Sequence, residues 1–506
     1  MKIKKFVLPL TFLAIVLLLL FLIKGEKGSP IYHQSPAARD TDTGGPFESS
    51  GSTSRYILTE AIVEDGTFIL NEERAKFAAP DVSKYNDTQF SIFSPGTAFF
   101  GIPFYLVGKQ VGLPQLITYA STAIIAALSV FIVTKIARMA GAGFYSSLLA
   151  GFLYLFATNA LTYSLSYTQH ILSTFLILLA ALSALGKRTL LSNIWFGILY
   201  GFGILVDIPN GIMMLPLILY VLYKQFEIKD RKNKISLKLK LSFVGLLIGL
   251  IPMLSLFGWY NYKLTGSFVR VAQRIGRAED FETEPVGEQL QGDSRGEIEL
   301  PFKTRNLSTG FYILLTSDQR GFLVYSPVLL IGILGFYILY KKKEKKSIGI
   351  LLAGVVLANL IVYASIGDPT GSWAFGPRYL IPSAAILAVF TGVAIDKYKR
   401  KSLFVILFII LSAYSIGVNV MGAMTTTQVP PKEEAVNLPD PVPYTFERNW
   451  QLMVEEGLNS SLVYNLYLSN KLTSKDYALI YTSAIFVLIA TLYLSSFAEK
   501  RRPKIL

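Results

Sequence analysis

Residues 6–23 have the sequence FVLPLTFLAIVLLLLFLI, carry no charge, and follow Lys2, Lys4 and Lys5. The run is close to the ~20 residues with which an α-helix crosses the ~30 Å hydrocarbon core of a bilayer. A signal peptide has a similar apolar region, but no small-residue cleavage site follows this one. We therefore interpret residues 6–23 as an uncleaved first membrane span.

Further apolar runs of the same kind follow along the chain. They lie at about 114–134, 144–162, 170–186, 191–206, 211–223, 241–259, 321–340, 347–366, 379–395, 402–421 and 477–496. Together with the first run they predict an all-α polytopic membrane protein with about 12 transmembrane helices. The runs at 191–206 and 211–223 are short and flank Asp207-Ile208-Pro209-Asn210. These two runs could be a broken or re-entrant pair.

The composition agrees with this fold class. Of the 506 residues, 52% are hydrophobic and only 16% are charged, whereas ordinary soluble domains have about 25% charged residues. These values exclude a soluble enzyme, a coiled coil and a disordered protein. Because the chain has no cysteine, a disulfide scaffold, a thiolate nucleophile and a zinc–thiolate site are excluded as well.

The charges between the runs predict the sidedness of the protein. If the N-terminus is cytoplasmic, the inner segments contain 27 of the 48 Lys and Arg residues but only 5 of the 34 acids. The outer segments then hold 21 basic and 29 acidic residues. This distribution follows the positive-inside rule. We therefore expect a multi-pass protein of the cell membrane with both termini cytoplasmic, and we interpret the basic runs as topology signals rather than a nucleic-acid site.

The long polar connections, at about 24–113, 260–320 and 422–476, all fall on the outer side. There, water-soluble groups can meet a lipid-borne substrate. The inner loops are short, and no glycine-rich phosphate loop followed by Lys-Ser/Thr occurs, which argues against a nucleotide-driven pump. We divide the chain into a catalytic core at 1–400 and C-terminal helices at 401–506.

Two short helices are expected within the first outer loop. From Arg55 to Phe68, apolar residues at 57, 58, 61 and 62 share one helical face, and Gly66 ends the helix. The apolar stretch Thr97–Val107 predicts a second helix. We place the second helix in the membrane interface, because a span at this point would move every later loop to the other side.

The motifs in and after this loop occur in a characteristic order over about residues 1–400. They are Arg55-Tyr56 with Val63–Thr67, Asp81 with Phe90-Ser91 and Ser94-Pro95-Gly96, Arg320–Pro327, and Trp373–Pro382. This order resembles the GT-C fold of membrane glycosyltransferases. Within that fold it is similar to the polyprenyl-phosphate-sugar enzymes that include protein O-mannosyltransferases and the aminoarabinose transferase of lipid A, and most of all to uncharacterised prokaryotic members.

The resemblance implies an inverting transfer of a monosaccharide, on the outer face, from a polyprenyl-phosphate donor to a protein, lipid or glycan acceptor. An acid early in the first loop would act as the general base. Many family members have an Asp or an Asp-Glu pair just before the helix tyrosine, whereas this chain has Ser52-Thr53-Ser54-Arg55 before Tyr56. The assignment of the base therefore stays open. The nearest acids are Asp40, Asp42 and Glu48 on one side and Glu60, Glu64 and Asp65 on the other.

Asp81 and Glu60 are the candidate catalytic acids. Asp81 lies between the two expected helices and is either the base, a residue that orients the acceptor, or a solvated turn residue. Glu60 lies on the polar face of the first helix, where it could instead form a surface ion pair with Arg55. Tyr56, on the same helix, and Arg55 are candidates for substrate binding.

Arg378 and Arg320 are candidate ligands of the donor phosphate, because a guanidinium fork matches phosphate oxygens. Each lies at the outer start of an apolar run. For Arg378 the alternative is interfacial snorkelling, and for Arg320 it is neutralisation by Asp318. Asp207 interrupts an apolar region, which favours a substrate-binding role, unless the turn at 207–210 simply lies at the outer surface.

No cofactor is expected. His33 and His170 are the only histidines and have no second ligand at metal spacing, although carboxylates could bind a divalent cation. Two alternatives to the enzyme remain. One is a secondary transporter, although the halves show no repeat. The other is an inactive relative that binds lipid-linked sugar.

Overall fold

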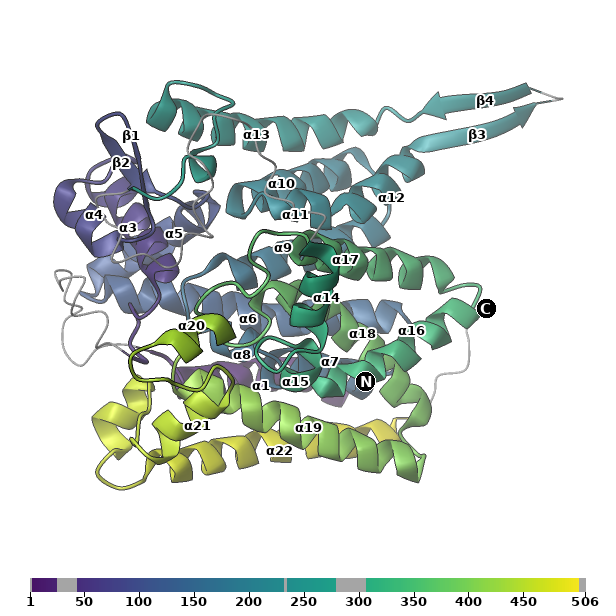
Figure 1. The fold of residues 1–506 in the computed structure, drawn as a ribbon. Helices are drawn as coiled ribbons and strands as arrows, with labels where there is room; N and C mark the ends of the chain where they lie inside the picture. The colour runs from purple at the N-terminus through teal and green to yellow at the C-terminus, as the bar shows by residue number, and fades with distance from the viewer. Residues whose placement is uncertain (1, 25–42, 232–233, 279–305, 500–506) are drawn as a thin grey trace.

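The structure, a computed structural model, describes residues 2–24, 43–231, 234–278 and 306–499, and long helices lying side by side make up most of it (Figure 1). Within these residues, 6 helices are long and apolar enough to cross a membrane. They are α6 (Pro114–Met139), α13 (Phe243–Thr265), α17 (Lys346–Ala364), α18 (Ile381–Tyr398) with the preceding turn from Arg378, α19 (Ser402–Met424) and α22 (Ser474–Ala498).

Shorter helices occupy the other predicted runs. They are α1 (Lys2–Leu20), α7 (Phe144–Phe156), α9 (Gln169–Leu185), α10 (Leu190–Val206), α12 (Leu215–Gln225) and α16 (Ile331–Lys341), which follows a 3₁₀ turn at Pro327–Leu330. Every apolar run expected from the sequence therefore forms helix. The all-α polytopic fold class is confirmed, and the number of spans stays a prediction.

The short runs around residue 207 form two helices joined by a sharp turn. The backbone of Asp207 is extended and ends α10. Pro209 then begins α11 (Pro209–Met213), where its missing N–H costs nothing. Helix α11 packs on α10 and α17, and α12 packs on α9 and α17. The chain thus reverses at Asp207, which lies at the tip of the turn.

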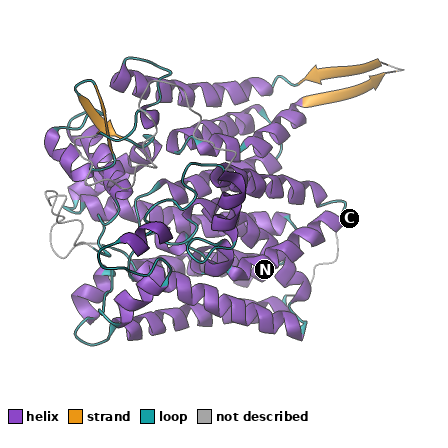
Figure 2. Ribbon diagram, in the orientation of Figure 1, coloured by secondary structure: helices purple, strands orange, loops and turns teal. Residues whose placement is uncertain are grey.

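One end of the bundle carries the structured part of the first long loop, residues 43–113, and we call it the loop end (Figure 1). Both expected helices are present there, as α3 (Ser50–Glu64) and α5 (Gly96–Gln110), and Gly66 follows α3 with a positive φ of 64°. Two further elements of this loop were not predicted from the sequence. They are α4 (Glu72–Ala78) and the hairpin of β1 (Val82–Tyr85) and β2 (Thr88–Ser91), whose strands are orange in Figure 2.

Other short elements lie at both ends of the bundle. The loop end also carries α20 (Lys432–Asn437) and α21 (Glu447–Val454), which follow α19 (Figure 1). A second hairpin, β3 (Phe226–Arg231) and β4 (Lys234–Leu239), projects from the opposite end. Further short helices are α8 (Ala160–Tyr163), α14 (Leu307–Leu315), α15 (Phe322–Tyr325), and a π-helical turn at Tyr464–Leu468.

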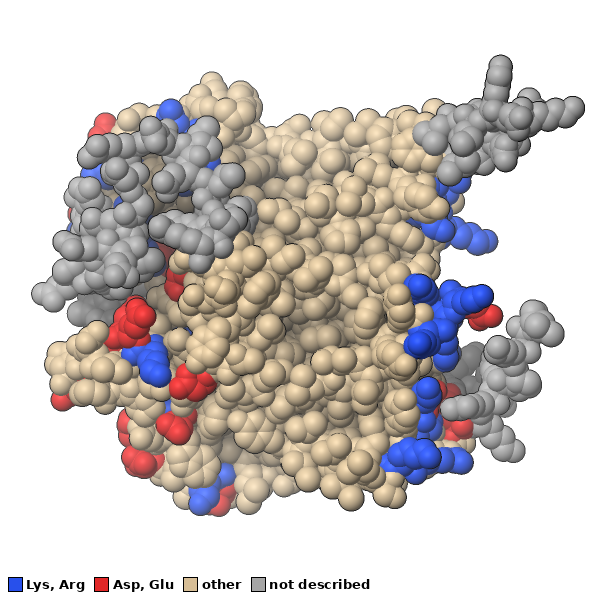
Figure 3. All heavy atoms as spheres, turned by 45° about the vertical axis from the view of Figure 1, so that its right-hand side comes forward, with Lys and Arg blue, Asp and Glu red and all other residues tan. Residues whose placement is uncertain are grey.

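Charged side chains separate along the bundle in the same way. Figure 3 shows Lys and Arg gathered at the end opposite the loop end, most of the visible Asp and Glu at the loop end, and a band without charged side chains between them. The basic end includes the connection from α16 to α17, with Lys341–Lys343, and the connection from α18 to α19, with Lys397 and Lys399–Lys401. The separation of basic from acidic side chains that the positive-inside rule requires is therefore present in the structure. Which end faces the cytoplasm stays a prediction.

Candidate functional site

Arg55 is a buried guanidinium on α3, although a helix in a polar loop would normally turn such a side chain to solvent. Its side chain is 4% exposed, its Nη1 donates to the carbonyl of Gly51 at 2.7 Å, and its guanidinium lies 3.6 Å from the centre of the Phe93 ring. Its Nε is buried and has no hydrogen-bond partner among the described residues. Arg55 thus keeps a donor for a further group.

Arg378 reaches the loop end from the other half of the chain. It begins the turn that leads into α18. Its Nη2 donates to the carbonyl of Gly371 at 2.7 Å, and its guanidinium lies 5.5 Å from the centre of the Tyr379 ring. Gly371 has a positive φ of 73°, and a Cβ there would lie 3.1 Å from Nε of Arg378. Within the described part of the chain, this Nε is also buried without a partner.

The two arginines belong to one electrostatic cluster. Burial lowers the pKa of Arg55 to about 10, and the charges that act on it are those of Asp207 and Asp81, which oppose the shift, and of Arg378, which adds to it. The side chain of His170 is also buried, between the rings of Tyr163 and Tyr379. Two guanidinium groups that each retain a buried, unpaired Nε–H are suited to an anion with several oxygens, such as a phosphate.

Asp207 lies at the turn between α10 and α11 and connects to Arg378 through two tyrosines. The hydroxyl of Tyr363 donates to Oδ2 of Asp207 at 3.2 Å. The ring of Tyr363 stacks on that of Tyr379, with 4.3 Å between ring centres and 6° between planes. Burial raises the pKa of Asp207, against the opposing effects of Arg55 and of hydrogen bonds from Tyr363 and Gln169. A column of Asp207, Tyr363 and Tyr379 therefore backs the Arg378 guanidinium.

The raised pKa of Asp207 predicts a stability gain on neutralisation. When folding raises the pKa of an acid, the folded protein loses stability as the pH rises from the pKa of that acid in the unfolded chain, 3.8, through its pKa in the folded protein. We expect Asp207→Asn to unfold at a higher temperature than the unmodified protein at pH 7. The difference should shrink as the pH falls toward 3.8. Thermal unfolding in detergent between pH 4 and 8 measures it, and an unchanged or lower unfolding temperature at pH 7 contradicts the burial argument.

Asp81 lies directly before β1 and is held from three sides. Its side chain is 6% exposed, Oδ1 forms an ion pair with Arg277 at 2.8 Å, and Oδ2 accepts from the Ser50 hydroxyl at 2.7 Å. The backbone carbonyl of Asp81 accepts from the Ser54 hydroxyl, also at 2.7 Å. These bonds orient the carboxylate and leave lone pairs on both oxygens. Arg277 was not expected, because nothing in the sequence of the second long loop distinguishes it.

Glu60 and Tyr56 lie in different surroundings from Asp81. Glu60 pairs with Arg74 of α4 at 3.3 Å, and the same arginine pairs with Asp65. The expected partner, Arg55, is thus replaced by a residue of a helix that the sequence analysis missed. Tyr56 is fully buried in an aromatic cluster that includes Phe47 and Tyr105 of the first loop and Tyr119 of α6.

Arg320 differs from the other two arginines, since carbonyl groups occupy its donors. It is fully buried, and it donates to the carbonyls of Thr370 (3.0 Å), Gln319 (2.9 Å), Ser372 (2.9 Å) and Val429 (2.8 Å). Its expected alternative partner, Asp318, pairs instead with the Tyr444 hydroxyl. These contacts join three loops and favour a structural part for Arg320.

The contacts of Arg320 predict a large effect on stability. We expect Arg320→Met to lower the free energy of unfolding by on the order of 3 kcal/mol or more, because each buried carbonyl left without a donor costs ~1–3 kcal/mol. Arg270→Met is the matched control, since Arg270 is exposed and lies over the Tyr85 ring. Thermal or denaturant unfolding of both variants checks this expectation. Equal stability of the two variants would contradict it.

Glu48, one of the acids near the helix tyrosine that the sequence left open as the general base, is buried. Its side chain is 5% exposed and pairs with Lys24 at 2.8 Å. Burial raises the pKa of Glu48, but the charge and hydrogen bond of Lys24 and the bonds from Thr426 and Thr427 outweigh burial and lower it. Two other acids considered from the sequence, Asp40 and Asp42, lie outside the described residues, as does His33.

The glycine of the Ser94-Pro95-Gly96 motif lies where α5 meets the end of α10. A Cβ on Gly96 would collide with the backbone of Leu205 and Val206, directly before Asp207. The motif therefore brings the first loop against the Asp207 turn. In the same way, Gly376 of the Trp373–Pro382 motif has a positive φ of 60° and packs on the ring of Tyr325 from the Arg320–Pro327 motif.

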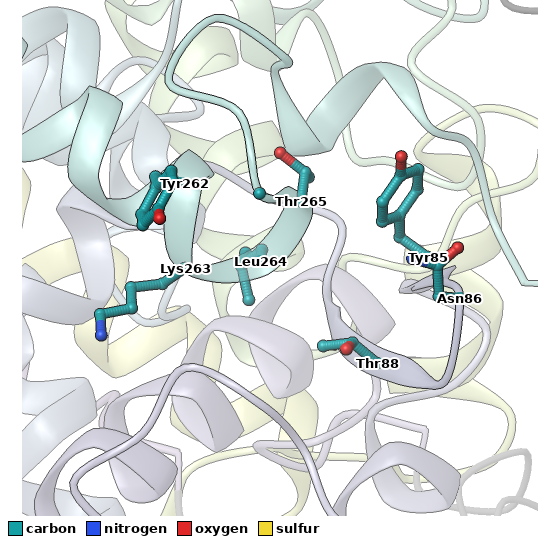
Figure 4. A pocket seen from close by; sticks show the side chains of 8 residues that line it. Tyr85, Asn86, Thr88, Tyr262, Lys263, Leu264 and Thr265 are labelled. Carbon is teal, nitrogen blue, oxygen red and sulfur yellow. The ribbon is translucent and has the colours of Figure 1, made fainter.

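A cavity of about 380 Å³ lies beside the β1–β2 turn (Figure 4). Tyr85, Asn86 and Thr88 of the hairpin line it, together with residues 262–266 at the end of α13. Because β1 follows Asp81 directly, this cavity belongs to the same hairpin as the candidate base. Aromatic rings, an amide and hydroxyl groups are suited to binding a polar molecule such as a sugar.

No group of three or more His, Asp and Glu side chains that could hold a metal ion occurs within residues 2–24, 43–231, 234–278 and 306–499. Asp207 and Asp81, the carboxylates whose charges act on Arg55, have hydrogen-bond or ion-pair partners within the protein.

Comparisons with known proteins give the fold. No family model matches the sequence, and no curated protein matches it by sequence. Among solved structures, ArnT from Cupriavidus metallidurans in the apo state is similar, with 12% identity, a TM-score of 0.51, and coverage of 98% of this chain and 78% of that chain. ArnT bound to undecaprenyl phosphate gives 13% identity, a TM-score of 0.51 and coverage of 98% and 77%.

An oligosaccharyltransferase from Archaeoglobus fulgidus, in complex with Zn and sulfate, gives 16% identity, a TM-score of 0.48, and coverage of 85% of this chain and 56% of that chain. The likeness to ArnT extends over almost the whole chain and shows that the protein has the GT-C fold.

Proposed function

We propose that the protein is a membrane glycosyltransferase that moves a monosaccharide from a polyprenyl-phosphate donor to a hydroxyl of a protein, lipid or glycan at the loop end. The observation that carries the proposal is the convergence of Arg55, which is buried, and Arg378, which is half-buried. Each has a buried Nε that is without a hydrogen-bond partner among the described residues. The fold shared with ArnT supports it, since that protein has been solved bound to undecaprenyl phosphate. In this proposal the loop end faces outward and both termini are cytoplasmic.

Arg378 and Arg55 would hold the donor phosphate. In the transfer, the bond between the anomeric carbon and the phosphate oxygen breaks, and the polyprenyl phosphate leaves with the electron pair. Two guanidinium groups stabilise the charge that develops on it. Since phosphate is a good leaving group, no general acid is required. Asp207 would act through the tyrosine column to keep Arg378 in place, and Arg320 would fix the loop that contains Gly371.

Asp81 would act as the general base. The acceptor oxygen forms the new bond to the anomeric carbon from the side opposite the phosphate, and its proton passes to the Asp81 carboxylate. Ser50 and Arg277 orient this carboxylate. Glu60 is a weaker candidate because it pairs with Arg74 and its charge is not among those that act on Arg55, whereas that of Asp81 is. Tyr56 would contribute by packing the helix that carries Arg55.

The test supplies the purified protein, in nanodiscs, with radiolabelled polyprenyl-phosphate monosaccharides and a panel of hydroxyl-bearing acceptors. Transfer from at least one donor, with inversion at the anomeric carbon, is the expected result. Binding of undecaprenyl phosphate without any transfer would favour an inactive relative. If the protein does not bind undecaprenyl phosphate but carries a substrate across the membrane of sealed vesicles, a transporter would be favoured.

A further inference from the structure

The C-terminal outer loop begins with an irregular segment, Thr425–Val429, which we call the strap. It follows α19 and precedes α20, and all of its residues except Gln428 are buried. Asn449 of α21 holds its start, since Nδ2 of Asn449 donates to Oγ1 of Thr425 and to the carbonyl of Thr426, each at 2.8 Å. The strap is thus a fixed part of the loop end.

One side of the strap binds the entrance to α3 through Glu48. Oε1 of Glu48 accepts from Lys24, from the backbone N–H of Thr427 at 2.9 Å and from its hydroxyl at 2.8 Å. Oε2 accepts from the Thr426 hydroxyl at 2.5 Å and from the N–H of Gly44 at 2.7 Å. Five donors therefore surround this carboxylate. With so many donors it is unsuited to accept a proton as a catalytic base, and its position two residues before α3 fixes where that helix begins.

The other side of the strap binds the loop that carries Arg378. The carbonyl of Val429 accepts from Nη2 of Arg320 at 2.8 Å and from the N–H of Ala374 at 2.9 Å. Arg320 also binds the carbonyls of Thr370 and Ser372. These residues flank Gly371, whose carbonyl accepts from Arg378. A series of hydrogen bonds, joined by the backbone of the strap and of the 370–372 segment, therefore runs from Glu48 to the partner of Arg378.

We propose that Glu48 is a positioning residue, and that through the strap it fixes the spacing between Arg55 and Arg378. The importance of this spacing for binding a lipid phosphate rests on the proposed function. The hydrogen-bonded connection from Glu48 through the strap to the loop of Arg378 does not depend on the proposed function. Because Lys24 is 2% exposed, loss of the Glu48 charge would leave a buried ammonium without a counter-charge. The strap would then lose its strongest partner, and both loops would become more mobile.

The test compares Glu48→Gln with the unmodified full-length protein in nanodiscs by two measurements. The first is hydrogen exchange of backbone amides in the absence of ligand. We expect faster exchange in α3 and also in the 368–378 loop, with α13 unchanged. The second is the Kd for undecaprenyl phosphate, which we expect to rise about tenfold. Glu455→Gln, an exposed acid after α21, is the matched control and should change neither.

The proposal would be overturned if Glu48→Gln exchanged faster in α3 alone. It would also be overturned if the unmodified protein bound undecaprenyl phosphate and Glu48→Gln bound it with the same Kd. If the unmodified protein binds no undecaprenyl phosphate, the proposed function fails, whereas the exchange experiment still tests the link. If Glu48→Gln does not fold, Thr427→Val replaces it, because it removes one hydroxyl donor and keeps the ion pair. That variant should show the same exchange pattern and a two- to fivefold rise in Kd.

Discussion

Arg378→Ala should weaken the binding of undecaprenyl phosphate by about 100-fold, the largest change in affinity that we expect from a single substitution. A hydrogen bond to a charged group contributes ~1.5–3 kcal/mol, and two such bonds correspond to roughly a hundredfold or more in Kd. The effect should be strong because Arg378 is held by the Gly371 carbonyl and by the Tyr379 ring, so little side-chain freedom is lost on binding.

Two further variants accompany this test. The first separates the contribution of the positive charge of Arg378 from that of its planar guanidinium geometry, and the second is a control. Arg378→Lys keeps the charge but not the planar fork, so it should restore only part of the affinity. Arg448→Ala is the control, since Arg448 lies over the ring of Trp373 in the loop that carries Arg378, but its charge is not among those that act on Arg55. Binding can be followed by native mass spectrometry or by displacement of a fluorescent polyprenyl phosphate. An unchanged Kd for Arg378→Ala would remove Arg378 from the phosphate site.

Asp81→Asn should reduce the rate of sugar transfer by about 10²–10⁴-fold, which is the usual contribution of a general base. Asparagine is nearly the same size and still accepts from Ser50, but it cannot take up the acceptor proton. The affinity for undecaprenyl phosphate should therefore stay within about twofold of the unmodified protein, so that the loss appears in kcat rather than in donor binding.

The matched control for Asp81 is Asp87→Asn, an exposed acid at the tip of the same hairpin. It carries the same chemical change and should leave transfer unaffected. A second control, Glu60→Gln, tests the other candidate base. Full transfer by Asp81→Asn together with loss of transfer in Glu60→Gln would contradict our assignment and move the base to the Arg74 cluster.

Much of the fold could be predicted from the sequence because membrane burial imposes a strong, local signal. Each apolar run formed a helix, and the charge count separated the loops into the two ends that the structure shows. Helix α3 was also predicted, since its apolar residues follow helical spacing, and so was α5, from the apolar stretch Thr97–Val107. The hairpin of β1 and β2 was missed because its strands have only 4 residues each, too few for a reliable alternation.

The site could be predicted only in part. Arg55, Asp81, Asp207 and Arg378 were identified as single residues, and the structure places them in one electrostatic cluster. The partners of the two acids could not be foreseen, because they come from distant segments. Arg277 lies 196 residues from Asp81, and Tyr363 lies 156 residues from Asp207. The contact between Arg320 and Val429 likewise spans 109 residues and that between Glu48 and Thr427 spans 379. No local pattern in a single sequence encodes such pairings.

The most direct test of the central claim is an experimental structure of the protein with undecaprenyl phosphate bound, determined in nanodiscs by cryo-electron microscopy. We predict density for the phosphate within hydrogen-bond distance of both Arg55 and Arg378, with the lipid tail leaving the loop end along the helices. A phosphate bound elsewhere, with the Nε atoms of both arginines still unpartnered, would contradict the account.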